Sequence, residues 1–203
     1  MLNIPNVLTW ARIVLIPIFV LAFYIPASWS SALTALIFGF AALTDWLDGY
    51  LARRWGQTSD FGAFLDPVAD KLMVAVALVL LVQSQPTPWL AIPAAVIIGR
   101  EIAVSALREW MAEIGERAHV SVSLMAKFKT TSQMLALLFL LYREPIGYFP
   151  TLSVGFVFLY ISAALTLWSM MLYLRAAWPI MMADRYNTPK KNVGTRFEQE
   201  SNL

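Results

Sequence analysis

The stretch that decides the fold runs from Ser31 to Gln83 and reads SALTALIFGFAALTDWLDGYLARRWGQTSDFGAFLDPVADKLMVAVALVLLVQ. It consists of two apolar segments, each long enough to cross the hydrocarbon core of a bilayer as a helix, joined by a short polar turn. Four carboxylates lie within the two segments, at Asp45, Asp48, Asp66 and Asp70. Acidic side chains are costly in membrane-spanning helices, and those that occur there usually have a function. The stretch therefore indicates both the class of fold and the place of the chemistry.

The composition of the whole chain supports a membrane protein. Of its 203 residues, 59% are hydrophobic and 14% are charged, and the mean hydropathy is +0.64. About a quarter of the residues of a soluble domain are charged. The apolar segments predict spans at residues 5–24, 31–53, 61–83, 89–112, 122–142 and 150–176. We therefore expect an all-α polytopic membrane protein with six transmembrane helices; a very apolar soluble helical protein is the alternative.

The six helices form one predicted membrane domain, residues 1–182, followed by a polar tail, residues 183–203, that is expected to be disordered. Loops on the cytoplasmic side of a membrane contain an excess of lysine and arginine. Eleven of these residues fall on one side of the predicted bundle: Arg53, Arg54, Arg108, Arg117, Lys127, Lys129, Arg175, Arg185, Lys190, Lys191 and Arg196. The other side contains only Arg143. Both termini are therefore expected to face the cytoplasm.

The four aspartates are predicted to lie at one depth. Asp45 and Asp48 are three residues apart and Asp66 and Asp70 four apart, so each pair lies on one face of its helix. In an antiparallel hairpin, Asp45 is then level with Asp70 and Asp48 with Asp66. At 1.5 Å per residue, this level is about 12 Å from the cytoplasmic helix ends. Side chains from two neighbouring helices can converge there.

Four close carboxylates cannot all remain ionised unaided, because like charges and desolvation favour protonation. Divalent cations remove this conflict. The chain has no cysteine and one histidine, His119, in a polar loop, so the ligands must be oxygen atoms, which suit Mg²⁺ or Mn²⁺. Two such ions can bind a phosphate ester during its displacement. The alternative is a structural network of ion pairs with Arg53, Arg54 and Lys71.

The motif Asp45-x2-Asp48-Gly49-x2-Ala52-Arg53-x8-Gly62-x3-Asp66-x3-Asp70 resembles the signature of the CDP-alcohol phosphotransferases at every specified position. The similarity extends to about Met182 and is greatest to the bacterial phosphatidylglycerophosphate synthases, including NIPNVLT, REIAVSALREWMAE and KFKTTSQ. This resemblance implies transfer of a phosphatidyl group from CDP-diacylglycerol to an alcohol, with release of CMP.

The resemblance also implies roles for individual residues. Asp45, Asp48, Asp66 and Asp70 are expected to bind the metal ions, and Asp70 is also expected to be the general base. The residues expected to contact CDP-diacylglycerol are Gly49, Arg53, Ser59, Thr9 and Asn6. Gly49 and Gly62 can alternatively serve close helix packing.

A phosphorylated acceptor needs basic side chains near the aspartates. Arg108 and Lys127 are the main candidates for binding its phosphate, and Lys129 and Arg100 are secondary candidates. Basic residues near a membrane surface can instead only orient the protein. Arg100 lies deeper, where a charge needs a partner, and Glu101 is expected to point elsewhere on the helix. Ala126 replaces a glycine that is frequent before Lys127 in relatives.

The synthase resemblance implies sn-glycerol 3-phosphate as acceptor, a bacterial inner membrane location with the active site facing the cytoplasm, no nucleic-acid partner and a possible homodimer. Inositol phosphate and serine are alternative acceptors, although serine has no phosphate for Arg108 and Lys127. A cation-coupled transporter is the alternative from another class. Its ionisable groups would usually lie near the midplane, within repeats that this sequence lacks. A non-catalytic scaffold leaves the motif unexplained.

Overall fold

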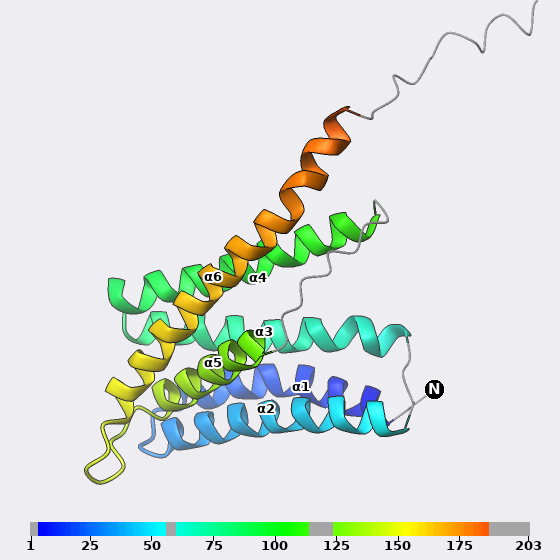
Figure 1. Ribbon diagram of the computed structural model, residues 1–203. Coiled ribbons are helices and arrows are strands. Elements are labelled where there is room, and N and C mark those ends of the chain that lie inside the picture. The colour runs from blue at the N-terminus through cyan, green and yellow to red at the C-terminus, as the bar shows by residue number, and fades with distance from the viewer. Residues whose placement is uncertain (1–3, 56–59, 114–123, 187–203) are drawn as a thin grey trace, which may run out of the picture.

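In the computed structural model, the described residues are 4–55, 60–113 and 124–186, and they form six helices without a β-strand (Figure 1). The helices are α1 (Ile4–Tyr24), α2 (Ser30–Trp55), α3 (Asp60–Ser84), α4 (Pro88–Glu113), α5 (Leu124–Tyr142) and α6 (Thr151–Tyr186). The all-α prediction is confirmed. The predicted limits agree with these helices to within two residues, except at the end of α6.

Helix α6 is longer than predicted. It ends at Tyr186, whereas the predicted span ends near residue 176 and the apolar part of the helix ends at Pro179. The predicted limits come from the length of apolar sequence that fits into the hydrocarbon core, and a helix can extend beyond that sequence. The helix continues through Pro179, which cannot donate a backbone hydrogen bond, and the residues around it include alanine and methionine, which are good helix formers. In Figure 1 this last part of α6 projects beyond the other helices.

Short turns join the helices at the end of the bundle where α1 ends and α2 begins. The Ser30 hydroxyl donates a hydrogen bond to the Ala22 carbonyl at 2.6 Å. Between α5 and α6, the Thr151 hydroxyl donates to the Glu144 carbonyl at 2.7 Å. The chain turns there through Gly147, whose φ of 61° is a conformation that glycine adopts without strain. Successive helices joined by such short turns run antiparallel.

The core lies where α5 packs against α6 and α2, and where α1 packs against α2 and α3. Helix α4 packs against α6 and α3. The largest fully buried apolar side chains of the core are Phe19, Phe38, Leu78, Leu81, Leu90, Ile97, Leu137, Leu140, Leu141 and Leu159. At Gly155 on α6, an added Cβ would lie 2.9 Å from the Cγ of Leu140. A glycine is therefore needed for the close approach of α5 and α6.

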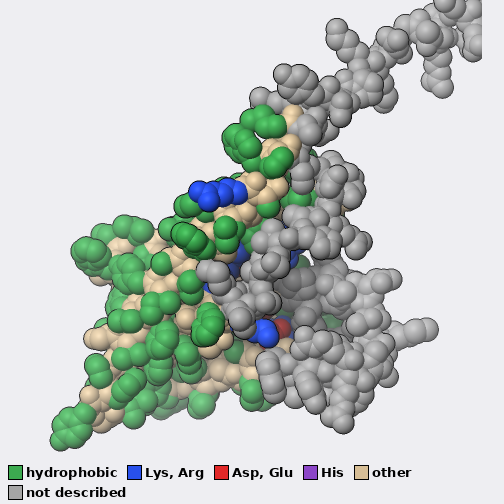
Figure 2. All heavy atoms as spheres, viewed as in Figure 1, with side chains coloured by type: hydrophobic (Ala, Val, Ile, Leu, Met, Phe, Trp, Pro, Cys, Tyr) green, Lys and Arg blue, Asp and Glu red, His purple; other side chains and the backbone are tan. Residues whose placement is uncertain are grey.

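The outer surface of the bundle is apolar. Within the described residues, two helices are long and apolar enough to cross a membrane, Pro88–Ala112 and Thr151–Pro179, and two shorter apolar segments are Trp10–Tyr24 and Ser30–Asp45. Hydrophobic side chains cover much of the face in Figure 2, and Leu36 is 70% exposed. An exposed apolar surface of this extent suits contact with lipid. The crossing of all six helices and the cytoplasmic placement of both termini stay predictions.

Candidate active site

The four motif aspartates lie on two antiparallel helices, toward the same end of the bundle. Asp45 and Asp48 are in the second half of α2, and Asp66 and Asp70 are in the first half of α3. The side chains of Asp45 and Asp70 are partly buried. Those of Asp48 and Asp66 lie outside the described residues, so the convergence of all four carboxylates stays a prediction.

Helix α1 lies against both acid-bearing helices. In the described part of the chain, α2 packs mainly against α1 and α5, and α3 packs mainly against α1 and α4, rather than against each other. The sequence predicts α2 and α3 as direct neighbours and gives α1 no part in the aspartate cluster. The structure gives α1 a place beside both, which makes its polar residues part of the site.

Arg12 of α1 is a charged residue beside the candidate site that was not predicted from the sequence. Its side chain is only 1% exposed, and its Nη1 lies 2.7 Å from Oδ1 of Asp45, which is 32% exposed. The pair brings a buried positive charge next to one of the predicted metal ligands. The sequence contained a sign of this contact, because Arg12 is an ionisable residue inside an apolar span. Such residues, like the aspartates, are expected to face the interior of the bundle and to pair with an opposite charge.

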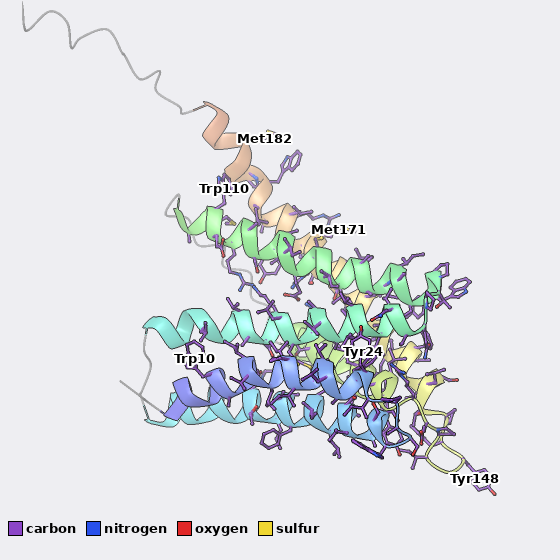
Figure 3. All side chains as sticks on the ribbon, turned by 180° about the vertical axis from the view of Figure 1, so that it is seen from behind. Trp10, Tyr24, Trp110, Tyr148, Met171 and Met182 are labelled. Atoms are coloured by element: carbon purple, nitrogen blue, oxygen red, sulfur yellow. The ribbon has the colours of Figure 1, made fainter. Side chains whose placement is uncertain are left out.

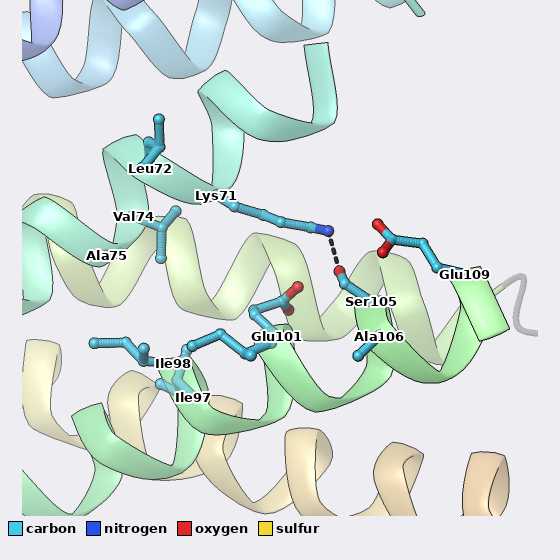
Figure 4. Close-up of a pocket in the computed structure, with 11 residues that line it drawn as sticks. Lys71, Leu72, Val74, Ala75, Ile97, Ile98, Glu101, Ser105, Ala106 and Glu109 are labelled. Carbon is cyan, nitrogen blue, oxygen red and sulfur yellow. Dashed lines mark hydrogen bonds between the residues drawn. The ribbon is translucent and has the colours of Figure 1, made fainter. Parts of the chain in front are cut away.

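Lys71, directly after Asp70, links α3 to α4. Its Nζ donates a hydrogen bond to Oγ of Ser105 (Figure 4). The two side chains border a cavity of about 430 Å³ between the helices, whose other walls include the apolar Val74 and Ile97 and the acidic Glu101. Lys71 was expected to pair with the aspartates if the cluster were a structural salt-bridge network. Its contact is with Ser105, and the side chains of Arg53 and Arg54 lie outside the described residues, so the network stays an alternative.

Glu101 is the centre of a second charged cluster. Its Oε1 lies 2.5 Å from Nζ of Lys129, which is 5% exposed, and 3.1 Å from Nη1 of Arg100. Nη2 of Arg100 also donates to Oγ of Ser169 on α6 at 2.9 Å. The prediction that Glu101 points away from Arg100 is wrong. Long side chains on adjacent helical residues can bend toward each other, and the positive charge of Lys129 draws the carboxylate to the same place.

Arg108 and Lys127, the main candidates for the acceptor phosphate, are both exposed. Nη2 of Arg108 lies 3.4 Å from Oη of Tyr173 on α6, and the guanidinium lies 5.8 Å from the centre of the Tyr173 ring. Lys127 is in the first turn of α5. Lys129 and Arg100, the secondary candidates, instead form ion pairs with Glu101. A joint phosphate site of Arg108 and Lys127 stays a prediction.

Four of the five residues expected to contact CDP-diacylglycerol lie on helix segments at the same end of the bundle as the aspartates. Asn6 and Thr9 are in the first two turns of α1, and Gly49 and Arg53 are in the last turns of α2. Their side chains lie outside the described residues, as does all of Ser59. The backbone arrangement is compatible with one nucleotide pocket formed by α1 and α2.

The donor set suits a hard divalent cation. Among the described side chains, no group of three or more histidines, cysteines, aspartates or glutamates could hold a metal ion, since two of the four motif aspartates lie outside that set. All four are carboxylates on α2 and α3, and oxygen ligands of this kind favour Mg²⁺ and Mn²⁺ over zinc or copper. The residue types and their positions on the two helices therefore fit such an ion.

Residues 2–168 match the family model of the CDP-alcohol phosphatidyltransferases. The chain belongs to this family. The matched range includes the whole aspartate motif and helices α1 to α5. The resemblance drawn from the motif is thereby confirmed, and the chain is a member of a family of transferases. CDP-alcohol phosphatidyltransferases generally use a divalent metal ion, in keeping with the donor set.

Relatives from several bacteria have the same specific name. A CDP-diacylglycerol–glycerol-3-phosphate 3-phosphatidyltransferase of Pseudomonas fluorescens is 60% identical over 184 residues, which are 90% of this chain and 94% of the relative. Proteins with this name from Pectobacterium atrosepticum and Yersinia enterocolitica are 60% identical over 176 residues and 59% identical over 180 residues. These alignments cover 86% and 87% of this chain, and 94% and 96% of the two relatives.

Proposed function

We propose that this CDP-alcohol phosphatidyltransferase transfers the phosphatidyl group of CDP-diacylglycerol to sn-glycerol 3-phosphate and releases CMP. The observation that supports this most strongly is the identity of 60%, over 90% of the chain, with a relative named for this reaction. The product is phosphatidylglycerol phosphate. The proposed location is the bacterial inner membrane, with six helices spanning the bilayer and the aspartates near its cytoplasmic face.

The reaction exchanges one phosphorus–oxygen bond for another. A hydroxyl oxygen of glycerol 3-phosphate attacks the phosphorus that bears diacylglycerol, and the bond from that phosphorus to the CMP oxygen breaks. CMP leaves with the electron pair of that bond, and the hydroxyl proton passes to the carboxylate of Asp70. Asp45, Asp48, Asp66 and Asp70 would hold two Mg²⁺ or Mn²⁺ ions, which would neutralise charge on the diphosphate.

Other residues are proposed to position the metal-binding carboxylates and the donor substrate. Arg12 holds Asp45 through the ion pair at 2.7 Å and so fixes the direction of one ligand on α2. Gly49, Arg53, Ser59, Thr9 and Asn6 would bind the cytidine diphosphate. The depth of the site has a physical reason, because the acyl chains of the donor stay in lipid while its head group and the acceptor are soluble.

Arg108 and Lys127 are the proposed ligands of the acceptor phosphate. Both are exposed and therefore accessible to a soluble ligand. Lys129 and Arg100 are proposed as secondary ligands, because both already form ion pairs with the carboxylate of Glu101. A charge-assisted contact to a phosphate contributes about 1.5–3 kcal/mol, so loss of Arg108 should raise the KM for glycerol 3-phosphate by about tenfold or more.

The test is CMP release by the purified protein in detergent, with CDP-diacylglycerol and, in turn, glycerol 3-phosphate, inositol phosphate and serine. Glycerol 3-phosphate should give the fastest turnover. Arg108→Gln should raise the KM for it, whereas the control Arg175→Gln, an exposed arginine on α6, should not. Faster turnover with serine would contradict both the acceptor and the phosphate site.

A further inference from the structure

A cavity with both polar and apolar walls lies at the end of the bundle opposite the aspartates. It has a volume of about 440 Å³ and is enclosed by the turn between α1 and α2 and by the start of the turn between α5 and α6. Its polar lining includes Ser28, Ser31, Arg143 and Glu144. None of these residues has a part in the proposed transfer reaction. Arg143 is also the single basic residue that the sequence places on the outer side of the membrane.

Among the described side chains, none forms an ion pair with the guanidinium of Arg143. Its centre lies 4.5 Å from the centre of the Phe23 ring, so one face stacks on an aromatic side chain. Its Nε and Nη2 are buried, and neither has a hydrogen-bond partner among the described residues. Burial lowers the pKa of Arg143, but an arginine remains charged in proteins. Buried donors of a charged group that have no acceptor are costly, so these two nitrogens indicate an anionic ligand with oxygen acceptors.

The cavity walls suit a phosphodiester better than free phosphate. Two nitrogens of Arg143 can donate to two phosphate oxygens, which is the preferred geometry of arginine with phosphate. The hydroxyls of Ser28 and Ser31 line the same cavity and can donate further hydrogen bonds. The carboxylate of Glu144 also lines it, and its negative charge disfavours the doubly charged form of free phosphate more than a singly charged diester.

Aromatic side chains mark this end of the bundle as the depth of lipid head groups. Tyr24, Trp29 and Trp89 are 53%, 55% and 71% exposed and lie at the ends of helices that meet here. Tyr24 and Tyr148 lie at the end away from Trp10 and Trp110 in Figure 3. Tyrosine and tryptophan concentrate at the membrane interface. This argument rests on the proposed crossing of the membrane by the bundle.

We propose that Arg143, with Ser28 and Ser31, binds the phosphodiester of a membrane phospholipid in the outer leaflet. The phosphate occupies the cavity and accepts hydrogen bonds from the guanidinium of Arg143, which lines it. The acyl chains lie against the exposed apolar surface of α1, where Leu21 is 69% exposed. The site is separate from the catalytic end and ties the turn between α1 and α2 to the turn between α5 and α6.

The test is native mass spectrometry of the protein in detergent, titrated with dioleoyl phosphatidylglycerol, with dioleoylglycerol as a control that lacks the phosphate. Arg143→Gln should weaken phosphatidylglycerol binding by about tenfold or more, because it removes charge-assisted hydrogen bonds. Arg175→Gln, at the other end of α6 from this cavity, should not change it. CMP release should be unchanged in both variants, which separates this proposal from the proposed reaction.

Three results would overturn the proposal. The first is equal phosphatidylglycerol binding by Arg143→Gln and Arg175→Gln. The second is equal binding of dioleoylglycerol and phosphatidylglycerol. The third is thermal stabilisation by inorganic phosphate that depends on Arg143 while lipid binding does not, since this would identify a free anion as the ligand. If Arg143→Gln fails to fold, the double variant Ser28→Ala/Ser31→Ala, which keeps the arginine, should still weaken phosphatidylglycerol binding, and unchanged binding would again contradict the proposal.

Discussion

Replacement of Arg12 by leucine tests the ion pair that the structure adds to the aspartate cluster. At an N–O distance of 2.7 Å, two unit charges attract each other by about 6 kcal/mol at an effective dielectric constant of about 20. Asp45 is 32% exposed, so solvent screens part of this attraction. Removing Arg12 also removes the cost of desolvating it, so the net loss of stability is smaller than the attraction. Breaking a buried pair by removal of one partner costs about 3–5 kcal/mol. The partial exposure of Asp45 places the expected loss near the lower limit, at about 3 kcal/mol.

The assay is the thermal unfolding of the purified protein in detergent with a chelator present, followed by tryptophan fluorescence. For a chain of this length, a loss of 3 kcal/mol lowers Tm by about 6–12 °C. Arg175→Leu, which removes an exposed arginine, should shift Tm by no more than about 2 °C. The double variant Arg12→Leu/Asp45→Asn removes both charges and should recover most of the lost stability. A Tm for Arg12→Leu within 2 °C of the wild type would refute the argument.

Three further variants test other parts of the structure. Gly155→Ala should destabilise the protein by about 1–3 kcal/mol, because its Cβ would lie 2.9 Å from Leu140. The control is Gly39→Ala, whose Cβ would lie 3.4 Å from the flexible side chain of Leu138 and which should have a smaller effect. An equal Tm for the two variants would contradict the packing argument. Glu101→Gln leaves the buried Lys129 without its counter-ion and should lower Tm more than Glu109→Gln, an exposed change on the same helix. Asp70→Asn should fold but release CMP at least about a hundredfold more slowly, and near wild-type turnover would exclude Asp70 as the base.

The helices were predictable from the sequence because their length and apolar character are local properties. The six segments were found with limits close to the observed ones, and the spacing of Asp45, Asp48, Asp66 and Asp70 indicated the family. The end of α6 was not predicted, since the apolar length rule cannot follow a helix beyond the membrane.

Contacts between helices were not predictable in the same way. Arg12 and Asp45 are 33 residues apart, and their pairing depends on how α1 packs against α2. Glu101 was placed from its position on α4 alone, whereas Lys129 on α5 decides where its carboxylate lies. Both errors have one cause: a charge in an apolar bundle turns toward the nearest opposite charge, and that neighbour is set by tertiary packing.

The most direct test of the central claim is CMP release from CDP-diacylglycerol and glycerol 3-phosphate after all divalent ions have been removed by a chelator. If the carboxylates of α2 and α3 hold catalytic cations, turnover should stop and should return when excess Mg²⁺ or Mn²⁺ is added. Full turnover by the metal-free protein would contradict the account.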